Sequence, residues 1–272
     1  MIKTSYLTHL GTPSRVWAIS AVHGQTPRLN AIHSAIWPHF KAGDRIVYLG
    51  NYLGHPDRDD NPDTIDTIIM FKNALMTQHE ISGGDITILR GIHEEMLQKT
   101  LQLQFAKQPY DVLTWLLQQG LEGILNHYGA TASEGLSACR GGIITLTRWT
   151  NDLRAKIRQR TGHEVFYNGL KRAAFTHNAD TDEGVLFVHA GLDTDRPLYT
   201  QKDNFWWGGK SFDAMNTPYS PFRRVVRGHD PQHKGLHIDD IKISLDDSVN
   251  RQEKLVCAMM DARGDVLDLL SI

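Results

Sequence analysis

Four histidines of the chain stand within two residues of a glycine, at the ends of short apolar runs. Imidazole is both a common metal ligand and a group that takes up or releases protons near neutral pH. A nearby glycine lets the backbone turn sharply, so the side chain can reach the end of a strand. A fifth segment of the same kind, "GNYLGHP" (50–56), offers an amide and an imidazole instead. The candidate residues are His23, His93, His189, His229, Asn51 and His55.

Alternating strand and helix patterns precede these residues. Apolar runs at 15–20, 44–50 and 85–91 indicate strands, and helices are predicted between them. The first helix has Thr26 as a predicted N-cap and Pro27 at its first position, and the second opens at Asn61-Pro62. This order predicts a parallel sheet with right-handed crossovers.

Residues 94 to about 175 are typical of helices, and strands return after them at 184–191, 223–229, 240–246, 254–261 and 265–272. The last two flank a short turn with Gly264 and indicate a hairpin. We therefore expect an α/β protein with a mostly helical insert around 94–175. No Pro/Gly/Ser-rich linker or repeat divides the chain, so we expect one domain over 1–272.

The candidate residues all follow predicted strands. In open α/β sheets, functional groups gather in the loops beyond the carboxyl ends of the strands. The five segments are therefore expected to meet in one site. A single histidine beside a glycine is usually only a hydrogen-bonded turn residue, so the inference depends on the set.

The five segments together resemble those of the phosphoprotein phosphatase branch of the calcineurin-like metallophosphoesterases. That family has G-D-x-H-G, G-D-x-x-D-R-G, G-N-H-E, H-A-G and G-H-x-P in this order. The closest segments here are "ILRGIHEEM" and "LFVHAGL", and the match runs from about residue 15 to the end. The resemblance implies a β-sandwich flanked by helices with a two-metal site at its edge. It also implies metal ligation by His23, His189 and His229, and a leaving-group acid at His93.

The chain departs from the family pattern where the family has its charged and amide ligands. Ala21 replaces the aspartate of the first segment, Asn51 the bridging aspartate of the second, and Ile92 the asparagine of the third. Gly54 and His55 stand where the family has Asp-Arg, so His93 lacks its carboxylate partner and the phosphoryl group lacks a guanidinium fork.

These departures predict an eroded metal site. Two neighbouring divalent ions need a bridging carboxylate between them, and Asn51 is neutral. We therefore expect no intact dinuclear centre, and either no metal or a single divalent ion, zinc or manganese, held by the remaining histidines. Arg90 and Arg224 are candidate phosphate ligands, although each alone could be a surface charge.

We therefore expect a pseudophosphatase that binds a phosphorylated or nucleotide ligand, or a protein partner. The alternative is a weak phosphoesterase with a mononuclear His-rich site, rebuilt with Asp193, Asp230 or Glu94. The formal net charge of −2 disfavours nucleic acid, and no apolar run approaches the roughly 20 residues of a membrane span. The N-terminus lacks a secretory pattern, and the two cysteines are far apart, so we expect a cytoplasmic protein.

Overall fold

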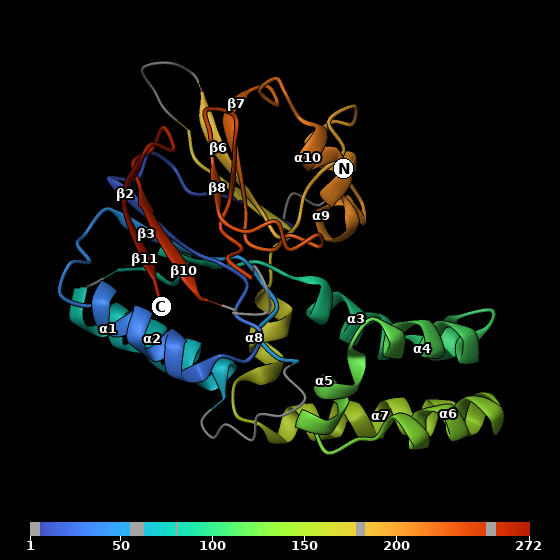
Figure 1. Ribbon diagram of the computed structural model, residues 1–272. Coiled ribbons are helices and arrows are strands. Elements are labelled where there is room, and N and C mark those ends of the chain that lie inside the picture. The colour runs from blue at the N-terminus through green and yellow to red at the C-terminus, as the bar shows by residue number, and fades with distance from the viewer. Residues whose placement is uncertain (1–5, 55–62, 80, 178–182, 249–253) are drawn as a thin grey trace.

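The structure is a computed structural model that describes residues 6–54, 63–79, 81–177, 183–248 and 254–272 of the 272-residue chain. Two β-sheets pack face to face, helices cover the outer face of one sheet, and a group of helices projects to one side (Figure 1).

The first sheet has the strand order β1-β5-β6-β7-β9-β8 and the second the order β11-β10-β2-β3-β4. Strands β2, β3 and β4 are parallel, as are β6, β7 and β9, whereas β10 and β11 form an antiparallel hairpin. The strands are β1 (Leu7–His9), β2 (Arg15–Ile19), β3 (Asp44–Tyr48), β4 (Ile86–Ile88), β5 (Ala173–Phe175), β6 (Gly184–Val188), β7 (Phe222–Arg227), β8 (His237–Ile238), β9 (Lys242–Ser244), β10 (Val256–Met260) and β11 (Val266–Ser271).

Ten α-helices lie within the described residues. Helices α1 and α2 run below the second sheet, and α3 to α7 form the projecting arm (Figure 1). The helices are α1 (Thr26–Ile36), α2 (Thr64–His79), α3 (Ile92–Thr100), α4 (Pro109–Gln118), α5 (Leu121–His127), α6 (Ala132–Arg140), α7 (Ile143–Gln159), α8 (His163–Gly169), α9 (Asn204–Trp207) and α10 (Gly209–Ala214), with short 3-10 turns at Gly83–Asp85, Leu103–Phe105 and Leu198–Thr200.

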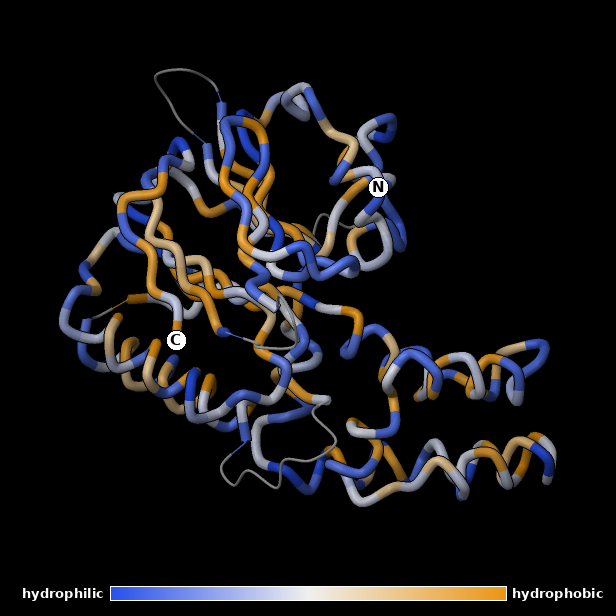
Figure 2. Tube along the Cα trace, in the orientation of Figure 1, coloured by the Kyte–Doolittle hydropathy of each residue, from blue (hydrophilic) through white to orange (hydrophobic). Residues whose placement is uncertain are grey.

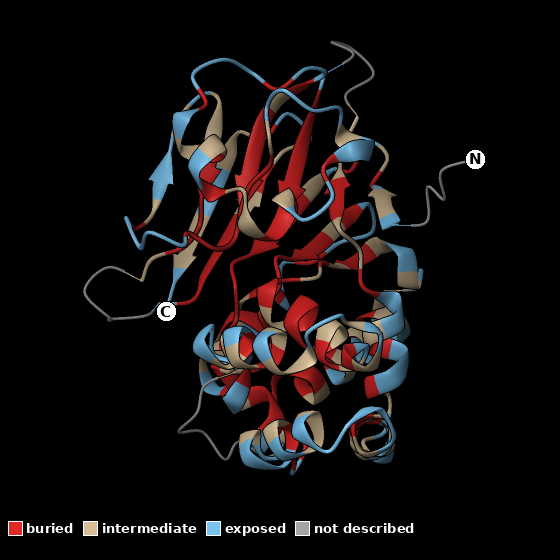
Figure 3. Cartoon of the chain, turned by 90° about the vertical axis from the view of Figure 1, so that its right-hand side faces the viewer, coloured by how far each residue is buried: buried red, intermediate tan, exposed pale blue. Residues whose placement is uncertain are grey.

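Strand β2 shows how the two cores are separated. Val16 and Ala18 belong to the apolar layer between the sheets, whereas Trp17 and Ile19 belong to the layer that packs on the helices. This alternation follows from the two-residue period of a strand. Orange residues accordingly follow both sheets in Figure 2, and the strands are the most deeply buried part of the molecule in Figure 3.

The expected fold class is confirmed: two sheets form a sandwich flanked by helices, with a mostly helical segment between β4 and β5. The first helix differs in detail, because Gln25 is its N-cap and Thr26 already its first residue. The sequence pattern did not indicate β1, β5 or β8, which are two or three residues long, and β5 lies at the end of the segment expected to be helical. The proposed helix start at Asn61-Pro62 lies outside the described residues.

Within the described ranges, none of the helices combines the length and apolar character needed to cross a bilayer.

Candidate functional site

Backbone hydrogen bonds hold the five loops together at one edge of the sandwich. Val22 N–H donates to Gly50 O (3.1 Å) and Gly24 N–H to Tyr52 O (3.1 Å), which extends the β2–β3 pairing into the loops. Ala21 N–H donates to Gly228 O (3.0 Å), which joins a loop of the second sheet to a loop of the first. The carboxyl ends of β2, β3, β6 and β7 therefore share one edge, as expected from the strand order.

Two residues of this edge adopt the left-handed backbone conformation that side chains other than glycine rarely adopt. His23 has φ 50° and Asn51 has φ 55°. Asparagine and histidine adopt this region more often than most other residues, although the conformation is uncommon for either. Unfavourable backbone conformations concentrate at functional sites because the surrounding structure must hold them.

The four predicted histidines gather into one cluster, which we call the histidine cluster: His23, His93, His189 and His229. The ring of His23 lies 5.4 Å from that of His93 and 5.4 Å from that of His229, measured between centroids. The rings of His189 and His229 stack 5.2 Å apart. His189 and His229 are buried, whereas His23 and His93 are half-buried and form the accessible side.

Backbone carbonyls orient two of the rings. His189 Nδ1 lies 2.5 Å from Leu49 O, and His93 Nδ1 lies 2.5 Å from Leu53 O. A carbonyl only accepts, so both Nδ1 atoms carry the proton and both Nε2 atoms of the neutral rings keep a lone pair. Leu53 O thus takes the place of the carboxylate that the resemblance implied for His93. His189 Nε2 is buried and has no hydrogen-bond partner among the described residues.

The environment keeps these imidazoles neutral. Burial lowers the pKa of His93 to about 4. The hydrogen bond to Leu53 O raises the pKa, but by less than burial lowers it. Burial also lowers the pKa values of His23 and His189 well below the usual range, and the neighbouring His229 lowers them further. Near pH 7 these three rings are therefore bases and ligands rather than cations.

Asn51 occupies the centre of the loops, buried like Ala21 and Ile92. Asn51 Oδ1 accepts a hydrogen bond from His93 N–H at 3.1 Å, and Asn51 Nδ2 has no partner among the described residues. The buried Glu94 carboxylate accepts the N–H groups of Asn51 and Tyr52 at 2.9 and 2.8 Å. Glu94 therefore fixes the Asn51 loop and is not free to serve the histidine cluster.

The structure adds Asp246, which the sequence analysis missed. Its Oδ2 lies 3.2 Å from His229 Nδ1. Burial alone would raise the pKa of Asp246, but pairing with His229 and hydrogen bonds from Ser248 and Asp230 N–H hold it well below the usual range. Asp246 follows β9, so the rule that located the other loops would have found it.

The other carboxylates considered for the site are engaged elsewhere. Asp230 pairs with Arg227 at 3.0 Å, and Asp193 pairs with Arg196 at 2.9 Å. Asp246 is thus the one carboxylate that the described residues place against the histidine cluster. A donor set of four imidazoles, one amide and one carboxylate does not fit two divalent ions, which need a bridging anion between them.

The two predicted phosphate ligands lie in different places. Arg90 pairs with Glu95 at 3.1 Å and, with Arg154 and Arg158, lines a pocket of about 260 Å³ behind α3. Arg224 is paired with Asp240 and Asp265 at 3.1 and 3.0 Å. It stands three residues before the end of β7, near the β10–β11 turn at the opposite edge of the sandwich. The structure therefore does not bring Arg224 to the histidine cluster. His55 lies outside the described residues.

A second cluster of metal-type ligands lies among the helices. Asp63, His127 and His163 have ligand atoms within 4.8 Å of one another, and in the described part of the chain no other three such side chains meet this closely. The structure thus offers a candidate site for a single metal ion, but not at the histidines that the sequence indicated. These residues are distant in sequence and match no motif, so sequence reasoning had no signal for them.

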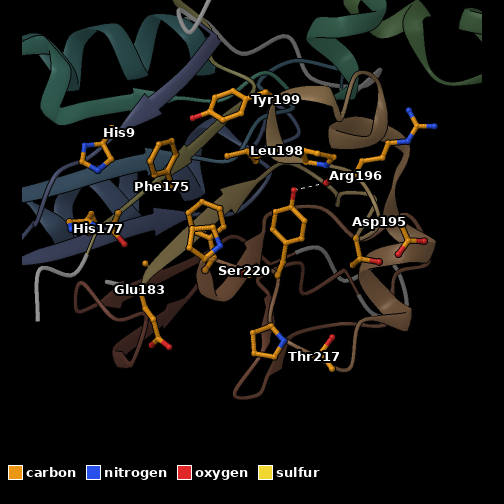
Figure 4. Close-up of a pocket in the computed structure, with 18 of the residues that line it drawn as sticks. His9, Phe175, His177, Glu183, Asp195, Arg196, Leu198, Tyr199, Thr217 and Ser220 are labelled. Atoms are coloured by element: carbon orange, nitrogen blue, oxygen red, sulfur yellow. Dashed lines mark hydrogen bonds between the residues drawn. The ribbon is translucent and has the colours of Figure 1, made fainter. Parts of the chain in front are cut away.

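A large pocket of about 830 Å³ lies apart from both clusters. Gly184 and Phe222, the first residues of β6 and β7, line it, so it opens at the opposite ends of the strands that carry His189 and His229. Figure 4 shows His9, Phe175 and His177 on one side and Asp195 and Arg196 on the other. Its size alone does not connect it to the chemistry of the histidines.

Solved structures share this architecture. The chain aligns with a crystal structure provisionally described as a diadenosine tetraphosphatase over 98% of both chains, with a TM-score of 0.51 and 17% identity. The chain therefore has the fold of this structure. Weaker likenesses include a serine/threonine phosphatase from Saccharomyces cerevisiae (12% identity, TM-score 0.48, 98% of this chain and 82% of that one) and a cold-active protein-tyrosine phosphatase from Shewanella (15%, 0.45, 98% and 82%).

No protein-family model and no curated protein sequence matches the chain. At these low identities the structural likeness establishes the fold and not the activity.

Proposed function

We propose that the histidine cluster binds a phosphate-bearing ligand, and that the protein hydrolyses phosphoesters weakly or not at all. The observation that carries the proposal is Asn51. Its amide Nδ2 is buried without a partner among the described residues, and a buried donor of this kind is costly unless something satisfies it. A phosphate oxygen is a strong acceptor of the required kind.

The neighbouring positions support weak or absent hydrolysis. Ala21 and Ile92 are buried beside Asn51 and offer no oxygen ligand from their side chains. Arg224 is paired with Asp240 and Asp265 away from the histidines, and Arg90 is paired with Glu95. Binding can survive such losses, because it requires donors and shape, whereas hydrolysis requires an activated water molecule as well.

The ligand class follows from the same chemistry. A phosphorylated peptide or a nucleotide carries the phosphate that the proposal needs, and a protein partner without phosphate is the competing occupant. We do not propose nucleic acid or a membrane surface, because the formal net charge is −2 and both partners attract basic patches.

Calorimetry with inorganic phosphate and a phosphoserine peptide, in the presence of a chelator, tests this function. An anion favours protonated imidazole, and burial holds the pKa of the free His93 at about 4, so affinity should rise several-fold as the pH falls from about 6 toward 4. Asn51→Ala should weaken binding about tenfold, in line with the loss of one hydrogen bond to a charged group. The exposed Asn30→Ala variant is the matched control. Absence of binding to either probe at both pH values would overturn the proposal.

A second candidate function is phosphoester hydrolysis with one metal ion. It is favoured by the contact between His229 Nδ1 and Asp246, and by that between His189 Nδ1 and Leu49 O. Metal-binding histidines commonly have such partners on the other ring nitrogen. Assays of a generic phosphomonoester with added manganese or zinc decide between the candidates. A turnover of about 1 per second or more that His93→Ala abolishes would establish the enzyme and refute the binding protein.

A further inference from the structure

The cluster of Asp63, His127 and His163 joins three elements that are distant in the chain. Asp63 directly precedes α2, His127 is the last residue of α5, and His163 is the first residue of α8. Asp63 and His163 are buried. A ligand held by all three residues would therefore connect the sheet-covering helix α2 with the helical insert.

The distances between the ligand atoms suit a tetrahedral metal site. Asp63 Oδ2 lies 2.7 Å from His127 Nε2 and 3.8 Å from His163 Nε2. Asp66 lies in the first turn of α2, and its Oδ1 is 3.2 Å from His163 Nε2. Zinc–ligand distances of about 2.0–2.2 Å place neighbouring tetrahedral ligands roughly 3.3 Å apart. The observed separations scatter around this value.

One ring nitrogen of the cluster is left without a hydrogen bond. His127 Nε2 approaches Asp63 Oδ2, but the geometry is not that of a hydrogen bond, and the buried Nε2 has no other partner among the described residues. His163 Nδ1 is bonded to Tyr128 Oη at 2.7 Å. His163 Nε2 lies 3.2 Å from Asp66 Oδ1, so without a metal Nε2 donates to that carboxylate. In the other tautomer Nδ1 donates to Tyr128, and the Nε2 lone pair is available to a metal ion.

Arg160 is the competing cation. Its guanidinium lies 2.9 Å from Asp63 Oδ2 and 2.8 Å from Asp66 Oδ2. Without a metal, the cluster is an ion-pair network between two helices. However, one guanidinium offsets only one of the two carboxylates, and it does not satisfy His127 Nε2. The remaining negative charge and the unpaired nitrogen favour a second cation.

We propose that Asp63, His127 and His163 bind one zinc ion that fastens α2 to the helical insert. The same elements contact the loop that carries Asn51: Thr64 Oγ1 donates to Tyr52 O, and a side chain at Gly123 would meet Gly54 O at 3.0 Å. Bound zinc thus restricts the motion of the Asn51 loop through these contacts with Thr64 and α5. The zinc site uses none of the residues of the histidine cluster, so it stands or falls independently of the proposed function.

Zinc binding to the full-length chain tests this proposal. Protein stripped with a chelator is titrated with zinc in competition with a chromophoric chelator. We expect one equivalent per chain, a rise in Tm of several degrees with zinc, and a loss of affinity on the order of 100-fold or more in His127→Ala. His229→Ala is the matched control in the histidine cluster and should retain the zinc.

Cobalt provides a direct assignment that does not depend on the alanine variant folding. Cobalt-loaded His127→Cys should show a sulfur-to-metal charge-transfer band that the native protein lacks, because thiolate is a strong ligand for this type of ion. The proposal is overturned if the native chain takes up no zinc, or if His127→Cys shows no such band. Zinc binding lost in His229→Ala but kept in His127→Ala would also overturn it, and would assign the metal to the histidine cluster.

Discussion

His33 is a buried histidine that takes no part in either cluster. Its ring stacks on Phe71 with centroids 3.8 Å apart, and its Nε2 lies 2.8 Å from Tyr48 Oη. Burial lowers the pKa of His33 from 6.5 to about 3. The folded protein therefore requires the neutral ring, whereas the unfolded chain binds a proton below pH 6.5. The stability that His33 contributes is complete above pH 6.5 and is lost progressively as the pH falls toward 3.

Urea denaturation at pH 7.5 and pH 5 measures this effect. Below pH 6.5, the neutral His33 should reduce the unfolding free energy of the native protein by about 1.4 kcal/mol per pH unit. At pH 5 this loss, relative to pH 7.5, should be roughly 2 kcal/mol. Glutamine does not titrate. Between pH 7.5 and pH 5 the His33→Gln variant should therefore lose about 2 kcal/mol less unfolding free energy than the native protein loses. Equal losses in both proteins would contradict the prediction.

The lost ligands of the histidine cluster define a second prediction. Ala21→Asp, Asn51→Asp and Ile92→Asn return two carboxylates and one amide oxygen to the loops that present the histidines. We expect manganese to raise the Tm of this triple variant by several degrees and scarcely to move that of the native sequence, because metal binds only the folded state. Both proteins are compared in the His127→Ala background, so that the second cluster does not contribute.

The neutral control for this experiment is Ala21→Asn with Ile92→Asn, which has similar volumes but no new charge. The prediction is contradicted if manganese strongly stabilises the native protein and stabilises the triple variant no more. The histidine cluster would then bind metal with the ligands that it already has. Gly54 is left unchanged, because its φ is +119° and a Cβ there would lie 2.5 Å from His93 Nδ1.

At the scale of the elements, the Glu94 side chain joins the first turn of α3 to the Asn51 loop. Glu94 accepts backbone N–H groups from Asn51, Tyr52 and Gly91. Burial raises the pKa of Glu94, while these hydrogen bonds lower it. The side chain therefore connects the loop after β3 with the start of α3, which are 42 or 43 residues apart in sequence.

Replacing this carboxylate should loosen the connection. Glu94→Gln substitutes an N–H₂ group for one acceptor, so at least one backbone N–H loses its partner, and we expect a loss of about 2–3 kcal/mol in unfolding free energy. Glu95→Gln is the adjacent control, because Glu95 forms ion pairs with Arg90 and Lys99 rather than backbone bonds, and should cost about 1 kcal/mol or less. Denaturation that ranks the two variants in the opposite order would contradict this role.

At the scale of the whole molecule, the projecting arm shares its core with the sandwich. Leu113 in α4 and Leu29 in α1 are fully buried in one continuous apolar cluster. A shared core couples the unfolding of its parts. The expectation of a single domain over 1–272 thus becomes the prediction that arm and sandwich unfold in one transition.

Leucine-to-alanine substitutions measure this coupling. Leu113→Ala and Leu29→Ala should each reduce the unfolding free energy by about 2–5 kcal/mol. In each variant the single denaturation curve should therefore shift to a lower midpoint. Tryptophan fluorescence and far-ultraviolet circular dichroism should give coincident curves for both variants. A separate early transition in Leu113→Ala alone would show that the arm is an independent unit.

The sequence by itself determined which residues form the histidine cluster. His23, His93, His189 and His229 each follow a strand, and parallel strands bring their carboxyl ends to one edge. Short apolar runs also predicted most strands of the sandwich, because a strand that lies between two cores is apolar on both faces. Boundaries differed by a few residues, since strand ends are set by pairing partners that a linear pattern does not contain.

Only the tertiary structure decided what these residues contact. Leu53 O replaces the missing carboxylate at His93, and Asp246 joins His229 from another strand. Asp63, His127 and His163 meet although 64 and 36 residues separate them along the chain. Such contacts depend on how helices pack against one another. A local pattern of residues records the face of a helix but not the neighbour that this face will meet.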